Sequence, residues 1–168
     1  MFYASDAKVH FIPTNIGIVA MDSNEVQKHM VVTTKDIPPS RVGSHDVWIG
    51  NHYDAMDGEF LKRNISFIIS LAEFVPIGWT KHLFWPIRQG PHPEDFLRVA
   101  QIIEDLLAHG EKVLVHCFAG IDRSPTAVMA WLVQHRKIPV EQAIEEIKKS
   151  RPVANPHLEW MGWQRGSE

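Results

Sequence analysis

The stretch from Lys112 to Pro125 reads KVLVHCFAGIDRSP and decides the fold class that the sequence predicts. Its first part, Val113 to Val115, is an uninterrupted apolar and β-branched run that is typical of a buried central strand. Its last part begins a helix, because Pro125 stands in a first turn, where a missing amide hydrogen leaves no bond unmade. We therefore expect a strand over 112–116, a loop, and a helix from Ser124 to about Arg136.

Short β-rich runs alternate with helical patterns from Asp46 to Pro156, which indicates βαβ units. The other expected strands are residues 47–49, 65–71 and 82–85, and the other expected helices are residues 53–63, 96–107 and 139–150. We expect an α/β fold, a single domain with a central, mostly parallel sheet flanked by helices. A functional site in such a fold belongs at the carboxyl end of the 112–116 strand.

The first 36 residues form a separate part of the prediction. Apolar runs at residues 9–12, 16–20 and 31–33 indicate short strands of a hairpin or a meander. We expect residues 1–36 to be an N-terminal extension that packs on the domain and residues 37–165 to be the domain itself.

Composition limits the possible functions. The 168 residues are 45% hydrophobic and 22% charged, as in an ordinary globular domain, and the formal net charge of −3 disfavours a nucleic-acid binder that relies on bulk positive charge. No apolar run is long enough to cross a bilayer, and the N-terminus lacks the order of a secretory signal, so we expect a cytoplasmic protein. The single cysteine excludes an internal disulfide and a cluster of thiol ligands for a metal.

Residues 116–124, which we call the phosphate loop, combine features that suit an anion. A strand that turns into a helix here gathers backbone amides at the helix N-terminus. Gly120 lets the backbone approach an oxyanion, and Arg123 offers a planar fork that matches two phosphate oxygens. The helix end and the guanidinium both stabilise a thiolate at Cys117. Each residue alone also fits a structural role, but the joint pattern predicts a cysteine nucleophile that faces a bound phosphate.

The same residues resemble a known family. His116 to Ser124 is similar to the signature of dual-specificity protein tyrosine phosphatases, a His-Cys pair followed by five residues and Arg-Ser/Thr. The segment 47–51 with Asp54-Ala55 resembles an early strand and turn of that family, and the segment 150–156 resembles its C-terminal helix entry. The resemblance spans about residues 37–163 and implies that residues 37–165 are a dual-specificity phosphatase-like catalytic domain.

The resemblance also implies roles for individual residues. Cys117 would attack phosphorus and form a cysteinyl-phosphate, Arg123 would bind the phosphoryl oxygens, and Ser124 would stabilise the departing thiolate. His116 would orient the loop, and no metal or organic cofactor would be needed. The amides that complete the phosphate cradle would be those of Phe118, Ala119, Gly120, Ile121, Asp122 and Arg123. The implied substrates are phosphotyrosine and phosphoserine/threonine in proteins.

One position departs from the family pattern. Gln89 stands where the family has an aspartate that protonates the leaving oxygen, and an amide cannot act as an acid. Asp122 is the favoured replacement, because its place in the loop resembles phosphoinositide phosphatases of the Sac and myotubularin type. A carboxylate that only pairs with a neighbour is an equal interpretation of Asp122. The other candidates are His92, Glu94 and Asp95, of which the last two also suit the start of a helix.

Two other functions stay open at this point. The same loop could serve a phosphatase of a non-protein phosphate, such as a phosphoinositide or an RNA 5′ end, because it recognises phosphate rather than what carries it. Gln89 also suggests a non-catalytic module that only binds phosphate groups. The sequence indicates no oligomeric state.

Overall fold

The central element is a five-stranded sheet in which the strands lie in the order β3-β4-β7-β5-β6. The computed structural model describes residues 9–14, 17–22, 34–72 and 81–166, the first two stretches as backbone only. The strands are β3 (Ser40–Arg41), β4 (Val47–Gly50), β7 (Val113–His116), β5 (Phe67–Ser70) and β6 (His82–Phe84). Only β3 runs antiparallel to its neighbour, so the expected mostly parallel sheet is confirmed.

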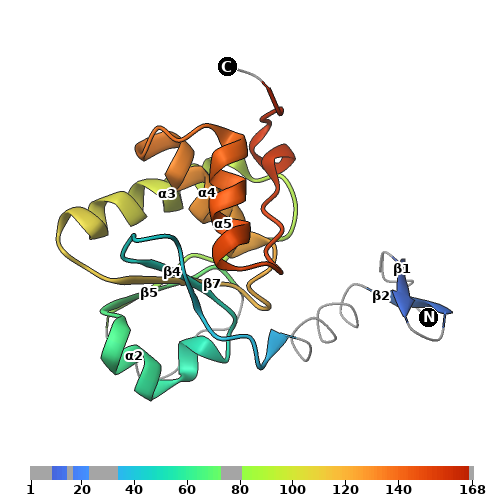
Figure 1. Ribbon diagram of the computed structural model, residues 1–168, viewed down its shortest axis with the longest axis horizontal. Helices are drawn as coiled ribbons and strands as arrows, with labels where there is room; N and C mark the ends of the chain where they lie inside the picture. The colour runs from blue at the N-terminus through green and yellow to red at the C-terminus, as the bar shows by residue number, and fades with distance from the viewer. Residues whose placement is uncertain (1–8, 15–16, 23–33, 73–80, 167–168) are drawn as a thin grey trace, which may run out of the picture.

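Helices cover both faces of the sheet (Figure 1). One layer holds α3 (Pro93–Ala108), α4 (Arg123–His135) and α5 (Val140–Ser150), and the other holds the 3-10 helix η1 (Asp54–Met56) and α2 (Gly58–Asn64). Side chains along β4 alternate accordingly. Val47 and Ile49 join the large core under the first layer, whereas Trp48 packs in the smaller core with Leu61 of α2. The expected α/β fold with helices on both sides is confirmed.

Strand β7 lies at the centre and delivers the phosphate loop to one edge of the sheet. In the parallel register, His116 stands beside Gly50 of β4 on one side and beside Ser70 of β5 on the other. The carboxyl ends of three strands therefore meet where residue 117 begins the loop, as expected for a site in an open α/β sheet. Directly after the loop comes α4, whose residues 123–132 are all buried because the helix packs against both α3 and α5.

The structure differs from the predicted helix over residues 53–63. Asp57 adopts an extended backbone and separates η1 from α2. Its carboxylate accepts a hydrogen bond of 3.2 Å from the backbone amide of Phe60, so it caps the second helix. The predicted strand over residues 65–71 is also shorter, since only Phe67–Ser70 pair with neighbouring strands.

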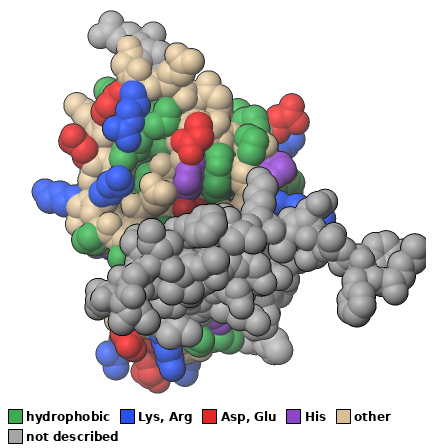
Figure 2. All heavy atoms as spheres, turned by 90° about the vertical axis from the view of Figure 1, so that its right-hand side faces the viewer, with side chains coloured by type: hydrophobic (Ala, Val, Ile, Leu, Met, Phe, Trp, Pro, Cys, Tyr) green, Lys and Arg blue, Asp and Glu red, His purple; other side chains and the backbone are tan. Residues whose placement is uncertain are grey.

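The N-terminal part contains a β-hairpin formed by β1 (Val9–Thr14) and β2 (Gly17–Asp22), which pair antiparallel. The expected strand at residues 31–33 lies outside the described residues. That residues 1–36 pack on the domain stays a prediction. None of the helices in the described ranges has the length and apolar character needed to cross a bilayer. On the face seen in Figure 2, the described surface carries basic and acidic side chains interspersed with hydrophobic ones.

Candidate active site

The candidate nucleophile, Cys117, lies directly after β7 and is only 2% exposed. Its Sγ atom is 3.2 Å from the Oγ atom of Ser124, in the first turn of α4. Because a hydroxyl is a stronger donor than a thiol, the Ser124 hydroxyl is the group that donates in this pair. The two residues that the sequence predicted as partners are therefore in contact.

Six consecutive carbonyl groups of the phosphate loop, those of residues 117–122, accept hydrogen bonds from groups that do not belong to these six residues. The bonds are His116 Nδ1 to Cys117 O (3.1 Å), His52 N to Phe118 O (3.2 Å), Arg151 Nη2 to Ala119 O (3.4 Å), Arg151 Nε to Gly120 O (2.8 Å), Asn155 N to Ile121 O (2.7 Å) and Thr126 Oγ1 to Asp122 O (2.7 Å). Every one of these carbonyls is therefore turned toward the surrounding protein.

The orientation of the carbonyls fixes the orientation of the amides. In a trans peptide, the carbonyl of one residue and the amide hydrogen of the next point in opposite directions, and the described residues contain no cis peptide. The amides of residues 118–123 consequently point away from the partners of the carbonyls. A run of inward amides that ends at the N-terminus of the 13-residue helix α4 has the form of an anion site.

Gly120 is required for the loop to pass over the end of β4. Its φ angle is +70°, and a Cβ atom there would lie 2.7 Å from the backbone oxygen of Gly50 and 2.6 Å from Nη2 of Arg151. Both the left-handed backbone and the close approach exclude a side chain. The sequence suggested the glycine for contact with an oxyanion, and the structure adds this packing against β4 as a second reason.

Arg123 is buried with one donor group unused. It is 4% exposed, and its Nη1 donates a 3.0 Å hydrogen bond to the backbone oxygen of Ile87. Its Nε is a buried side-chain nitrogen without a hydrogen-bond partner in the described part of the chain. A buried donor without a partner costs about 1–3 kcal/mol. The side chain is thus anchored at one end and keeps a donor available for a ligand.

Arg151 supports the loop from outside, a role that sequence reasoning missed. It is fully buried at the end of α5 and binds the Pro38 oxygen (3.0 Å) and the Ser40 hydroxyl (3.1 Å) as well as the two loop carbonyls. It also interacts with the buried carboxyl of Asp54, which accepts a 2.8 Å hydrogen bond from the Asn51 amide. Burial raises the pKa of Asp54 to about 6, although this hydrogen bond and Arg151 oppose the rise. The only sequence signal was the Arg-Pro pair after a helix.

His116 is neutral and part of a hydrogen-bond chain across three strands. Burial lowers its pKa to about 4. Its Nδ1 carries the ring proton, because it faces the Cys117 carbonyl, which can only accept. Its Nε2 therefore accepts a hydrogen bond from the Ser70 hydroxyl, whose oxygen lies 2.7 Å from Nε2 of His82 on β6. That His116 orients the loop stays a prediction, and this hydrogen-bond chain is what it rests on; no pattern in the sequence indicated that Ser70 and His82 would join it.

The side chain of Asp122 contacts a histidine from outside the phosphate loop. Its Oδ1 lies 2.7 Å from Nε2 of His157, and Nδ1 of the same ring lies 2.7 Å from Oε1 of Glu159. The ring also stacks on Trp160, with 4.0 Å between the ring centres. Burial lowers the pKa of His157, but the hydrogen bonds and the charges of Asp122 and Glu159 outweigh burial and raise it. No sequence pattern pointed to His157.

Gln89 lies in the loop that follows β6. Two residues before it, Ile87 is held by Arg123 through the hydrogen bond described above and by the Leu71 oxygen, which accepts from the Ile87 amide at 2.9 Å. Gln89 itself is exposed. The loop that carries Gln89 is therefore tied directly to the arginine of the phosphate loop through Ile87.

The three other acid candidates stand at the start of α3. His92 immediately precedes the helix, and Glu94 and Asp95 lie in its first turn, where negative charge is favoured. Asp95 also accepts a 3.2 Å hydrogen bond from Nε1 of Trp85. Glu94 and Asp95 therefore have a structural reason to stand at the start of α3, and Asp95 also has a hydrogen-bond partner there.

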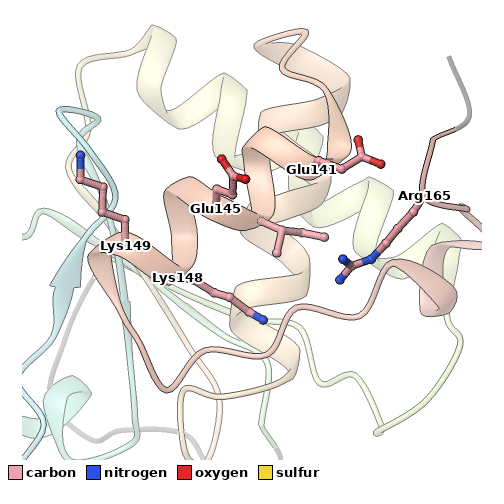
Figure 3. A pocket seen from close by; sticks show the side chains of 6 residues that line it. Glu141, Glu145, Lys148, Lys149 and Arg165 are labelled. Atoms are coloured by element: carbon pink, nitrogen blue, oxygen red, sulfur yellow. The ribbon is translucent and has the colours of Figure 1, made fainter.

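A surface cavity of about 440 Å³ lies elsewhere, along α5 (Figure 3). Its walls carry both signs of charge. The lining residues are Glu141, Ile144, Glu145, Lys148, Lys149 and Arg165. Because none of them belongs to the phosphate loop or touches it through the contacts above, we assign this cavity no part in the chemistry.

Comparison with known proteins agrees with the fold. Residues 47–165 match the family model of the dual specificity phosphatase catalytic domain. Dual specificity protein phosphatase 15 of Mus musculus is 34% identical over 129 residues, which are 70% of this chain and 55% of that protein. Dual specificity protein phosphatase 5 of Rattus norvegicus is 32% identical over 123 residues, 69% of this chain and 32% of that protein. The crystal structure of DUSP15 superimposes with a TM-score of 0.67 at 30% identity and covers 74% of this chain and 83% of that one.

The chain therefore belongs to the dual-specificity phosphatase family, within the cysteine-dependent protein tyrosine phosphatases. The predicted resemblance to dual-specificity phosphatases is confirmed. The chain spans about half the length of the mouse relative and about a third of the rat relative.

Proposed function

We propose that this chain is a cysteine-dependent phosphatase that hydrolyses phosphate monoesters, with phosphotyrosine and phosphoserine/threonine in proteins as its substrates. The observation that carries the proposal is the orientation of the phosphate loop, in which the amides of residues 118–123 all point away from the partners of the carbonyls. This run of donors connects Cys117 to the free Nε of Arg123. Such an arrangement suits a phosphoryl group whose negative charge grows on its oxygens.

In the first half of the reaction, the Cys117 sulfur attacks phosphorus, the S–P bond forms and the P–O ester bond breaks. Arg123 and the loop amides hold the three remaining oxygens of the phosphoryl group. The leaving oxygen takes the proton that Asp122 shares with His157, delivered through the Asp122 carboxyl. The 2.7 Å contact between these two residues supports this route.

In the second half, a water molecule attacks phosphorus and the S–P bond breaks. The proton of the water returns to the Asp122 carboxylate, and the sulfur leaves as a thiolate. The Ser124 hydroxyl, 3.2 Å away, donates to that thiolate as its charge develops. Phosphate is released and the site is restored, with no metal ion or organic cofactor involved.

Exposed Gln89 favours a second candidate function, a module that binds phosphorylated partners without turnover. The same inward amides and the same arginine would serve such a module, since binding needs the anion site but no acid. A phosphatase of phosphoinositides or RNA 5′ ends would also use this loop unchanged. The difference between these candidates lies in turnover and in what carries the phosphate.

Hydrolysis of p-nitrophenyl phosphate tests the proposal. We expect turnover by the wild-type chain and none by Cys117→Ser, while both bind tungstate, a phosphate-like oxyanion. Tungstate binding without any turnover by the wild type would favour the binding module. A panel of phosphopeptides, phosphoinositides and 5′-phosphorylated RNA at equal concentration then identifies the substrate class, and we expect the highest kcat/KM on phosphopeptides.

A further inference from the structure

The segment after α5 holds the second half of the phosphate loop through several contacts. The Asn155 amide donates to Ile121 O at 2.7 Å, and the His157 amide donates to the Thr126 hydroxyl oxygen at 2.9 Å. That hydroxyl in turn donates to Asp122 O at 2.7 Å. The segment therefore reaches the backbone of residues 121 and 122 both directly and through α4.

His157 adds a contact of a different kind, because it reaches the side chain of Asp122 with a ring nitrogen that can carry charge. The charged groups that face the ring are Asp122 from the start of α4 and Glu159 from the 3-10 helix η2 (Leu158–Met161), with Arg165 acting on Glu159. Trp160 covers the ring face. Two carboxylates at 2.7 Å on opposite ring nitrogens require that both nitrogens act as donors, which is the protonated form of histidine.

We propose that His157 is a positioning residue for the phosphate loop: in its protonated form it holds the Asp122 carboxylate and thereby keeps residues 121–123 in the arrangement that binds an oxyanion. The inference rests on the proposed use of the loop as a phosphate site. It assigns a function to a residue that lies 35 positions from its partner in the chain.

The proposal predicts a direction of pH dependence. The pKa of His157 is raised, so the proton is fully present below the ordinary histidine value of about 6.5 and is lost as the pH rises through the higher value of the folded protein. Loss of the proton leaves the ring with one donor nitrogen for two carboxylates and removes the positive charge that faces Asp122, so the Asp122 carboxylate is held less firmly. Oxyanion affinity should then decrease at alkaline pH.

Tungstate binding measured by calorimetry between about pH 6 and about pH 9 tests this prediction. The background variant is Cys117→Ser, which removes the thiol, and tungstate is kept dilute enough to remain the monomeric dianion at every pH. We expect the affinity of the background variant to fall about fivefold across the range. Adding His157→Gln keeps a donor at the same place but removes the titration, so the affinity should vary little with pH. His109→Gln changes an exposed histidine at the end of α3 and should leave the fivefold fall intact.

Asp122→Asn serves as a second variant in case His157→Gln does not fold, because it removes the charged partner instead, and it should also flatten the curve. Linkage offers a measurement that needs neither variant. If protonation of His157 strengthens tungstate binding, bound tungstate must raise the pKa of His157 by the matching amount, about 0.7 units for a fivefold change in affinity. The NMR titration of the His157 ring with and without tungstate measures this shift.

An unchanged pH dependence in a folded His157→Gln or Asp122→Asn variant, or a His157 titration that tungstate does not move, would overturn the proposal. The outcome is separable from that of the proposed function. A wild-type chain that turns over no ester but shows the pH-dependent tungstate affinity would refute the enzyme and keep the role of His157. An active enzyme whose tungstate affinity does not change with pH would keep the proposed function and refute the role of His157.

Discussion

The Sγ atom of Cys117 and the Oγ atom of Ser124 lie 3.2 Å apart, although the two residues are seven positions apart in the chain. The loop between them returns to its starting point because β7 and α4 bring its two ends together. A hydroxyl in this position contributes little while the sulfur is bonded to phosphorus, since an uncharged sulfur with two substituents is a weak hydrogen-bond acceptor. Its contribution grows when the sulfur leaves with a negative charge.

Ser124→Ala should therefore slow the second half of the reaction more than the first. We expect kcat to fall about tenfold to a hundredfold, the range of one lost hydrogen bond to a charged group. Rapid mixing with p-nitrophenyl phosphate should then show a burst of p-nitrophenol before the slow steady state. Ser150→Ala, at the end of α5, is the matched control and should behave as wild type. An unchanged kcat without a burst in Ser124→Ala would contradict the assigned role.

Arg123→Lys should lower kcat/KM on aryl phosphates by about a hundredfold or more. The guanidinium bonds to the Ile87 oxygen through Nη1 while Nε stays available, and a single ammonium cannot occupy both places. Arg136→Lys, at the other end of α4 and paired with Glu104, is the control and should retain nearly full activity. Comparable kcat/KM for Arg123→Lys and wild type would mean that the loop is not built around this contact.

The source of the leaving-group proton can be identified from rates on aryl phosphates of graded leaving-group pKa. If Asp122 delivers the proton, the wild-type rates depend only weakly on that pKa, and Asp122→Asn makes the dependence steep. In that case Gln89→Asp changes the wild-type rates little. If no acid exists, the wild-type dependence is already steep, Asp122→Asn has little effect, and Gln89→Asp raises rates on poor leaving groups by about a hundredfold. A flat dependence that survives Asp122→Asn would point instead to His92, Glu94 or Asp95.

Two buried groups should have opposite effects on stability as the pH falls. The pKa of His116 is lowered to about 4, so its contribution is present above about 6.5 and is lost as the pH falls toward 4. The pKa of Asp54 is raised to about 6, so its ionised form destabilises the folded state, and protonation removes that destabilisation over the same interval. Asp54→Asn keeps an acceptor for the Asn51 amide but removes this effect of protonation. Between about pH 7 and about pH 5, the variant should lose more free energy of unfolding than wild type, by on the order of 1 kcal/mol, in urea titrations. Equal losses would show that Asp54 is not the titrating group.

Local patterns were sufficient to predict the elements that hold the nucleophile. The apolar run before Cys117 and the Ser-Pro pair after Arg123 indicated a strand and a helix, and both formed with boundaries shifted by one residue. The split of the helix at Asp57 could also have been predicted, since Asp is a preferred residue at the N-cap of a helix and Asp-Gly is a turn signal.

The residues that surround the loop could not be predicted in the same way. Arg151 meets Gly120 across 31 positions, His157 meets Asp122 across 35, and Ser70 meets His116 across 46. Each contact depends on how whole strands and helices pack, which no local spacing records. Ser70 gave a weak signal as one of the two serines in the apolar run over residues 65–71, and its position at the carboxyl end of β5 explains why a hydroxyl is useful there.

The most direct test of the account is the detection of the phosphorylated cysteine. The wild-type chain is mixed with p-nitrophenyl phosphate, quenched in acid within the first turnover, and analysed by mass spectrometry of the peptide that contains residue 117. The account predicts one added phosphoryl group on Cys117, more of it in Ser124→Ala, and none in Cys117→Ser, which should still bind tungstate. Turnover by Cys117→Ser, or a phosphoryl group on another residue, would contradict it.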